Sequence, residues 1–152
     1  MKKIRGKRRY FRELWETVKS IKINPDNKEG YNYKHFHLDF YGYGNYSVKM
    51  RKEHITAHIE LCKRLREQLS GHINSFQCWV TIDMDDASAD AVYLHTENST
   101  GNPFPNEFEG VNWDCGIPSF LTTVLDKDKY CIGHFFSEYG EAYIIKPKEK
   151  VE

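Results

Sequence analysis

Apolar residues recur along the chain at helical spacing in two places. Over residues 5–21 they fall every three or four positions, which predicts a helix with one buried face. The same spacing predicts a second helix over residues 51–69, and Gly71 suits the position just beyond its last turn. The two apolar stripes are Phe11, Leu14, Trp15, Val18 and Ile21 in the first helix, and Ile55, Ile59, Cys62, Leu65 and Leu69 in the second.

Alternation of apolar and polar residues predicts strands in the rest of the chain. It is clearest over residues 35–41 and again over 76–84. An acidic turn joins the second of these runs to a strand over 91–95, so we expect an antiparallel pair. Residues 129–136 and 141–146 predict a last hairpin.

The remaining stretches carry weaker signals. Residues 98–112 are the least periodic segment and are predicted as loop. Pro118 suits the first turn of a short helix that reaches Leu125, because proline lacks an N–H that is not needed there. The alternation over 76–84 places Trp79 on the face opposite the other apolar residues of that strand.

The predicted order of elements is therefore α-β-α-β-β-α-β-β. Hairpins combined with separate helices are typical of an α+β fold rather than of repeated βαβ units. We expect a single α+β domain over residues 1–152, with a mainly antiparallel sheet of about five strands, two long helices and one short helix.

Charge is divided between the two halves of the chain, although basic and acidic residues number 22 each. Residues 1–70 contain 17 basic and 8 acidic side chains, a balance of +9, whereas residues 71–152 contain 5 and 14, a balance of −9. Such a division indicates either that one half contacts a charged partner or that the halves face each other and neutralise internally. Both interpretations stay open.

The basic N-terminus is the candidate nucleic-acid contact. Its four arginines would neutralise phosphates and release counterions without reading sequence. They are Arg5, Arg8, Arg9 and Arg12. After residue 12 the chain holds 15 basic against 22 acidic side chains, which would repel a long polyanion. Nucleic-acid binding is therefore the second alternative function.

Histidines supply the first alternative function, a metal-dependent hydrolase. His54 and His58 lie four residues apart on the second predicted helix, a spacing that places two imidazoles on one side of an ion. His37 and Asp39 of the first predicted strand would complete the ligand set. The strand histidines point away from the apolar face, however, and need not meet the helix. We expect no cofactor, and we expect imidazole, thiol and carboxylate groups not to converge in one cleft.

Cysteines and apolar runs bear on the compartment. Cys62, Cys78, Cys115 and Cys131 form no C-x-x-C pair, so we expect reduced thiols and a cytoplasmic protein. No apolar run approaches the roughly 18 residues of a membrane span, and we expect no membrane contact. No Gly-rich phosphate loop or G-x-S-x-G turn is present, and a Cys115–His134 pair would require the two residues to meet in space.

The opening segment Lys2-Lys3-Ile4-Arg5-Gly6-Lys7-Arg8-Arg9 resembles the start of a family of short, uncharacterised bacterial proteins. The strand His35-Phe36-His37-Leu38, followed by a helix, a strand pair and a terminal hairpin, is similar to the later order of that family. The resemblance implies a bacterial, cytosolic, standalone domain without an established activity. It therefore assigns no catalytic residue.

The function that we expect is non-enzymatic binding of another protein. A small aromatic-rich chain with an acidic half resembles, in general character, immunity proteins that neutralise toxin domains. Aromatic area and desolvated charge dominate binding energy at such surfaces. The predicted partner-binding face consists of Asp83, Asp85, Asp86, Asp90, Glu107, Glu109 and Asp114. The sequence indicates neither the partner's identity nor an oligomeric state.

Overall fold

The structure is a computed structural model that describes residues 7–23, 34–38, 48–69, 76–84, 90–96, 110–113, 118–125, 128–137 and 140–147. Its elements, in chain order, are α1 (Lys7–Ser20), β1 (Lys34–Phe36), α2 (Val48–Gln68), β2 (Phe76–Asp83), β3 (Ala91–Thr96), β4 (Asn112–Trp113), α3 (Ser119–Thr122), β5 (Tyr130–Ser137) and β6 (Gly140–Pro147).

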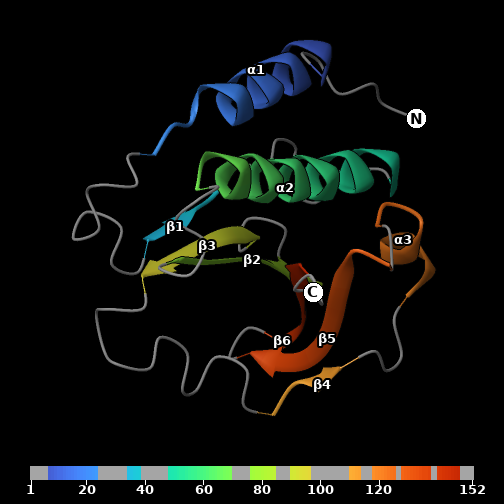
Figure 1. Cartoon of the computed structure of the whole chain (residues 1–152). Helices are drawn as coiled ribbons and strands as arrows, with labels where there is room; N and C mark the ends of the chain where they lie inside the picture. The colour runs from blue at the N-terminus through green and yellow to red at the C-terminus, as the bar shows by residue number, and fades with distance from the viewer. Residues whose placement is uncertain are drawn as a thin grey trace.

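These elements form layers (Figure 1). Helix α1 lies on α2, and α2 lies on one face of a sheet whose strand order is β1-β3-β2-β6-β5-β4. All neighbouring strands are antiparallel. The α+β class and the antiparallel sheet are therefore confirmed. No helix in the part of the chain that the structure describes is long and apolar enough to span a membrane.

The sheet has six strands rather than about five. The additional strand is β4, which pairs with β5 through Asn112 opposite His134 and Trp113 opposite Gly133. The prediction of loop up to Asn112 was wrong at that residue, because a strand of two residues leaves no periodic signal to detect. The order along the chain consequently contains one more strand than predicted.

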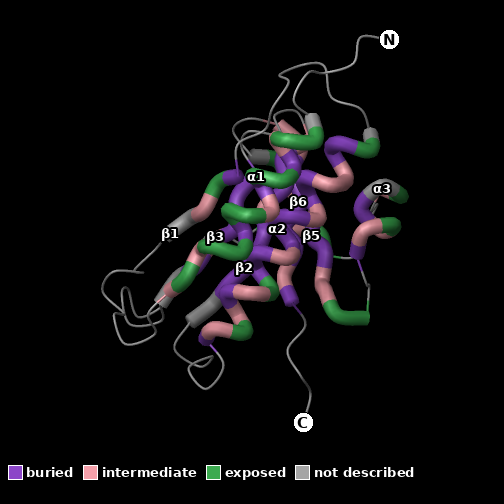
Figure 2. Tube along the Cα trace, turned by 90° about the horizontal axis from the view of Figure 1, so that it is seen from above, coloured by how far each residue is buried: buried purple, intermediate pink, exposed green. Residues whose placement is uncertain are grey.

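Helix α2 is the middle layer, so it is buried on two sides (Figure 2). Its predicted stripe, from Ile55 to Leu69, is buried as expected, but Ala57 and Leu61 are buried as well. The helix begins at Val48, three residues before the predicted start. Because α1 covers one side of α2 and the sheet covers the other, little of this helix is left for solvent.

Helix α1 is fixed on α2 by apolar packing and by two polar contacts. Phe11, Leu14 and Val18 are buried, as predicted from their spacing. The Trp15 indole N–H donates a hydrogen bond to Glu53 of α2 over 3.3 Å. Gln68 of α2 accepts from the Ile23 N–H at 2.9 Å and donates to the Ile21 carbonyl at 3.0 Å. These residues hold both ends of the α1–α2 contact.

Both faces of the sheet bury apolar side chains. The helix-facing side supplies Cys78, Val80, Ile82, Val92, Leu94, Ile132, Tyr143 and Ile145 to the main core. On the opposite side Trp79 and Ile144 form a second cluster, in which the Trp79 and Tyr93 rings stack with centroids 5.2 Å apart. The predicted placement of Trp79 opposite the other apolar residues of β2 is therefore confirmed.

The first strand and the short helix differ from prediction in their limits. Strand β1 ends at Phe36, whereas the alternation predicted a strand over residues 35–41, of which 39–41 lie outside the described chain. Helix α3 is one turn, Ser119–Thr122, and Pro118 precedes it in an extended conformation (φ −69°, ψ 149°) instead of forming its first turn. Residues 37 and 38 leave the strand because they bond elsewhere, as described below.

Candidate functional site

A cluster of ionisable side chains lies in the core where α2 meets the start of β3. Arg51, His54 and His58 come from α2, and Asp90 directly precedes β3. The exposed fractions of His54, His58 and Asp90 are 0%, and that of Arg51 is 9%. One nitrogen of each histidine and one Asp90 oxygen lie within 4.8 Å of one another. Imidazole and carboxylate groups therefore do converge, but in the closed core, whereas the prediction concerned a shared cleft that also included a thiol.

The central contact of this cluster is a bidentate ion pair. Arg51 donates from Nη1 to Asp90 Oδ2 and from Nη2 to Asp90 Oδ1, the second bond at 3.0 Å. Nη2 also donates to the Asp83 carbonyl oxygen at 2.7 Å, and the Asp83 N–H donates to Asp90 Oδ1 at 2.9 Å. The pair therefore joins the first turns of α2 to the end of β2 and the start of β3.

The carboxyl of Asp90 stays ionised in this setting. Burial alone raises its pKa, but the hydrogen bond from His54 and the nearby guanidinium of Arg51 outweigh that effect. The net result is a pKa below the ordinary value for aspartate. Asp90 therefore acts as the buried counter-ion of Arg51.

His54 and His37 extend the cluster to the chain that follows β1. His54 Nε2 donates to the Leu38 carbonyl oxygen at 2.8 Å, and its Nδ1 lies 3.2 Å from Asp90 Oδ2. His37 Nδ1 lies 2.9 Å from the backbone oxygen of Asp90 and therefore donates to it. These bonds take residues 37 and 38 out of β1. The His37 ring thus reaches the backbone of Asp90, while the group of possible metal ligands in the described residues consists of His54, His58 and Asp90 without His37; Asp39 lies outside the described residues.

His58 is the most isolated group of the cluster. Its Nδ1 donates to the His54 carbonyl oxygen, one turn earlier in α2, at 2.9 Å. Within the described residues its Nε2 has no hydrogen-bond partner. Burial is the main cause that lowers the pKa of His58 to about 4, and the His54 charge adds to it, while Asp90 and the bond to His54 oppose it. His58 is therefore neutral at physiological pH.

The charges of this cluster do not favour a metal centre. Arg51 and Asp90 already neutralise each other, and the guanidinium holds both carboxylate oxygens. A divalent cation at His54 and His58 would add two positive charges beside Arg51 in a dry core, where uncompensated charge costs several kcal/mol or more. The residues are also fully buried, so no substrate reaches them without opening the core. The metal-dependent hydrolase is thus disfavoured.

The predicted acidic face is wrong for two of its members. Asp83 and Asp90 have exposed fractions of 3% and 0%, because both take part in the bonds around Arg51. Neither can touch a partner. The other five members, Asp85, Asp86, Glu107, Glu109 and Asp114, lie outside the described residues, as does Cys115 of the proposed Cys115–His134 pair.

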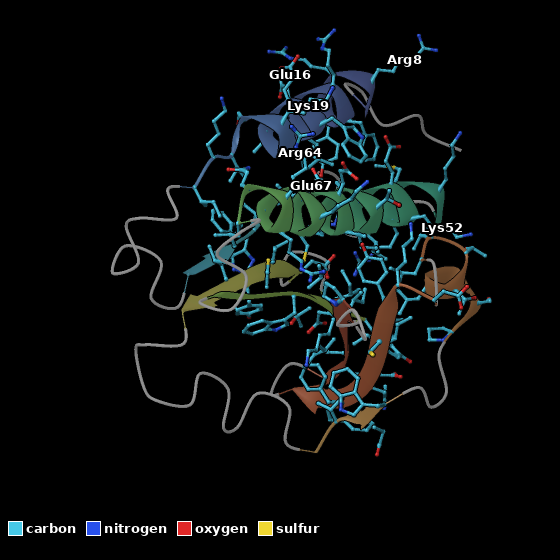
Figure 3. All side chains as sticks on the ribbon, viewed as in Figure 1. Arg8, Glu16, Lys19, Lys52, Arg64 and Glu67 are labelled. Atoms are coloured by element: carbon cyan, nitrogen blue, oxygen red, sulfur yellow. The ribbon has the colours of Figure 1, made fainter. Side chains whose placement is uncertain are left out.

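The basic helix is at the surface. Arg8, Arg9 and Arg12 of α1 are exposed, and Figure 3 shows Arg8 on this outer helix together with Glu16 and Lys19. Arg9 Nε is 3.0 Å from Glu13, so part of the positive charge is already paired. Arg5 lies outside the described residues. Acidic side chains lie among the arginines and oppose the attraction of phosphates. Nucleic-acid binding through this helix therefore stays a prediction.

A surface that the sequence did not indicate lies at the end of β5. Phe136 is 77% exposed, and its ring meets His134 edge-on with centroids 5.1 Å apart. His134 Nε2 lies 2.9 Å from Glu141 Oε1, and the Tyr143 hydroxyl donates to the same oxygen at 3.3 Å. The Glu141 side chain is 46% exposed. We call Phe136, His134 and Glu141 the Phe136 surface.

Trp113 of β4 lies at the same edge of the sheet, on the face opposite to Phe136. Its side chain is the second exposed aromatic of the described chain, at 38%. It lies over Gly133, where an added Cβ would come within 3.0 Å of the Trp113 ring and 2.2 Å of Val111. Gly133 is therefore required for β4 to sit this close to β5. The edge at β4 and β5 consequently presents one aromatic side chain on each face of the sheet.

Comparison with known proteins gives no relative. No family model matches the chain, and no curated protein or solved structure matches it. The resemblance of residues 2–9 to the start of short bacterial proteins therefore stays a prediction.

Replacing Asp90 by Ala is expected to lower the free energy of unfolding by about 3–5 kcal/mol, because it leaves Arg51 charged and without its counter-ion in the core. The double variant Arg51→Met with Asp90→Ala is expected to lose less than the sum of the two single changes. Urea denaturation measures both. Glu13→Ala, which removes an exposed ion pair, is the control and is expected to cost at most about 1 kcal/mol. Strictly additive single effects would contradict a coupled pair.

Stability is expected to fall as pH is lowered from 6.5 to about 4, by roughly 3 kcal/mol. His58 is neutral in the fold with its pKa lowered, so over this interval the unfolded chain binds the extra proton and the folded chain does not. The charged and titratable groups that face the His58 ring are His54, Asp90 and Arg51. All three are present both in the natural chain and in the variant His58→Phe. His58→Phe should flatten the urea-midpoint profile over this interval. An equally steep profile in His58→Phe would show that another group titrates.

Zinc or cobalt is expected not to bind at the core cluster, because Arg51 already supplies the positive charge there. Dialysis of untagged protein against a chelator should leave the melting temperature unchanged, and added Co²⁺ should give no visible absorption of a coordinated ion. Arg51→Met is the informative comparison, since it frees Asp90 and the two histidines. One equivalent of cobalt bound by the natural chain, and lost in His58→Phe, would contradict the charge argument.

Proposed function

We propose that this chain is a non-enzymatic protein that binds another protein through the Phe136 surface. The observation that carries the proposal is the exposure of Phe136, of which 77% is accessible to solvent. Exposed aromatic side chains are anchors of protein interfaces, because their burial against a partner contributes much of the binding energy.

Binding rather than turnover is favoured by where the reactive groups lie. The clustered histidines, His54 and His58, are fully buried beside the Arg51–Asp90 pair. His134 is partly accessible, and its Nε2 is engaged by Glu141. A general base needs access to the proton that it removes. The accessible groups at this end of the sheet are the apolar ring of Phe136 and, beside it, the carboxylate of Glu141. Such a combination favours binding of a protein.

The partner that we propose is a protein with a basic surface. Glu141 is half-exposed beside Phe136 and would meet a partner lysine or arginine. The second half of the chain supports this choice, since residues 71–152 carry a balance of −9. This combination agrees with the immunity-like character that we infer from the sequence. A bacterial origin and a cytoplasmic location belong to the same proposal.

Phe136→Ala is expected to weaken binding of the partner by roughly 30-fold or more, as is usual for an aromatic anchor. The partner is first captured by a photo-crosslinking amino acid at position 136 in native cells, with position 129 as the matched site, because Lys129 is exposed at the opposite end of β5. The captured protein is then purified, and its affinity is measured by calorimetry for the natural chain, for Phe136→Ala and for Lys129→Ala.

The affinities of the two variants and the capture from the two positions decide whether the Phe136 surface is the interface. Loss of affinity in Phe136→Ala with none in Lys129→Ala, together with weakening by added salt, supports the proposed surface and its basic partner. Equal capture from both positions, or equal affinity in both variants, would place the interface elsewhere on the molecule. Circular dichroism of the two variants checks that both are folded.

A further inference from the structure

The thiols of Cys62 and Cys78 meet in the core. Cys62 lies on α2 and Cys78 on β2, and their sulfur atoms are 3.5 Å apart although the residues are 16 positions apart in sequence. The exposed fractions of the two residues are 1% and 8%. Both thiols are free in the structure. This pair has no part in the proposed binding function.

We propose that Cys62 and Cys78 are a dithiol site that is oxidised to an internal disulfide by a low-molecular-weight disulfide such as glutathione disulfide. A disulfide needs its sulfur atoms about 2.05 Å apart, so the two atoms must approach by roughly 1.5 Å. The sulfur atoms already touch, so the proposed closure consists of rotation of the two side chains with a small shift of α2 towards the sheet.

The exchange is balanced in two steps. The Cys78 thiolate attacks one sulfur of the small disulfide and breaks its S–S bond, which leaves a mixed disulfide on Cys78 and releases one small thiolate that takes up the proton lost by Cys78. The Cys62 thiolate then attacks the Cys78 sulfur and breaks the mixed disulfide, and the second small thiolate takes up the proton lost by Cys62. Two protein thiols and one small disulfide thus become one protein disulfide and two small thiols. Both thiols are buried, so the exchange requires a local opening of the core, and Cys78 takes the first step because its exposed fraction is the larger of the two.

The rate of this exchange is set by the core. The hydrogen bond with Cys62, together with burial, raises the pKa of the Cys78 thiol well above its usual range. The thiolate is therefore scarce, so exchange with a small disulfide is slow. The disulfide between Cys62 and Cys78 is therefore expected to form when small disulfides accumulate.

The disulfide would fasten α2 at a second place. Arg51 ties the first turns of α2 to the end of β2, and Cys62 lies 11 residues further along the helix, about three turns away. Cys78 lies near the start of β2, opposite Leu94 of β3. The oxidised protein would thus hold α2 on the sheet at both ends of β2, by an ion pair at one and a covalent bond at the other.

The test uses the full chain with Cys115→Ser and Cys131→Ser, so that only the pair remains. Incubation with excess glutathione disulfide is expected to link the peptides of Cys62 and Cys78, seen by mass spectrometry after alkylation of remaining thiols. The melting temperature should rise by roughly 5–10 °C, as expected for a loop of this length, and return after dithiothreitol. The matched control adds Cys62→Ser and should show neither effect.

Three outcomes would overturn the proposal. The pair could stay alkylatable while Cys131 of the natural chain takes up glutathione under the same conditions. Cys78 could keep glutathione as a stable mixed disulfide with Cys62 still a thiol. The linked protein could melt at or below the temperature of the reduced protein. Peptide mapping of the oxidised natural chain repeats the measurement without any substitution, so a folding defect of the serine variants does not affect the result.

Discussion

The ion pair between Arg51 and Asp90 organises the part of the molecule where α2 meets the sheet. It is buried, bidentate and extended by bonds to the backbone of Asp83 and the side chain of His54. A charge in the core is tolerated only with its counter-ion in place. The pair therefore fixes the position of α2 along its axis relative to the strands of the sheet. The same bonds take residues 37 and 38 out of β1. One electrostatic requirement thus determines the contact of three separate chain segments.

That requirement also decides what the histidines do. In the sequence His54 and His58 have the spacing of metal ligands, and in the structure they lie beside a carboxylate. The guanidinium of Arg51, however, already holds both oxygens of that carboxylate and balances its charge. The groups that looked most like a reaction centre therefore hold the fold together. The Phe136 surface lies at the same end of the sheet, where Ala142 of β6 is paired with Asp83 of β2 on one side and with Phe135 of β5 on the other.

The division of charge along the chain has a partial counterpart in space. Arg51 of the basic half and Asp90 of the acidic half neutralise each other in the core, which is the internal alternative that the charge count left open. Arg8, Arg9 and Arg12 remain on the outer helix, away from the sheet (Figure 3). Internal neutralisation therefore applies to the Arg51–Asp90 pair, whereas a charged partner for the exposed arginines stays a prediction.

Sequence pattern alone determined the two long helices, their apolar stripes, the antiparallel pair of β2 and β3 and the last hairpin, because helix and strand periodicity is local and each of these segments is long enough to display it. Tertiary structure decided the rest. Alternation in β5 places Phe136 on the same face as buried Ile132, yet Phe136 is exposed; Figure 1 shows that the end of β5 lies away from α2. From its sequence neighbours Asp90 is predicted to be a surface turn residue. In the folded chain it pairs with Arg51, which is 39 residues away in sequence. Burial and ion pairing depend on which distant segments meet, and no local period records that.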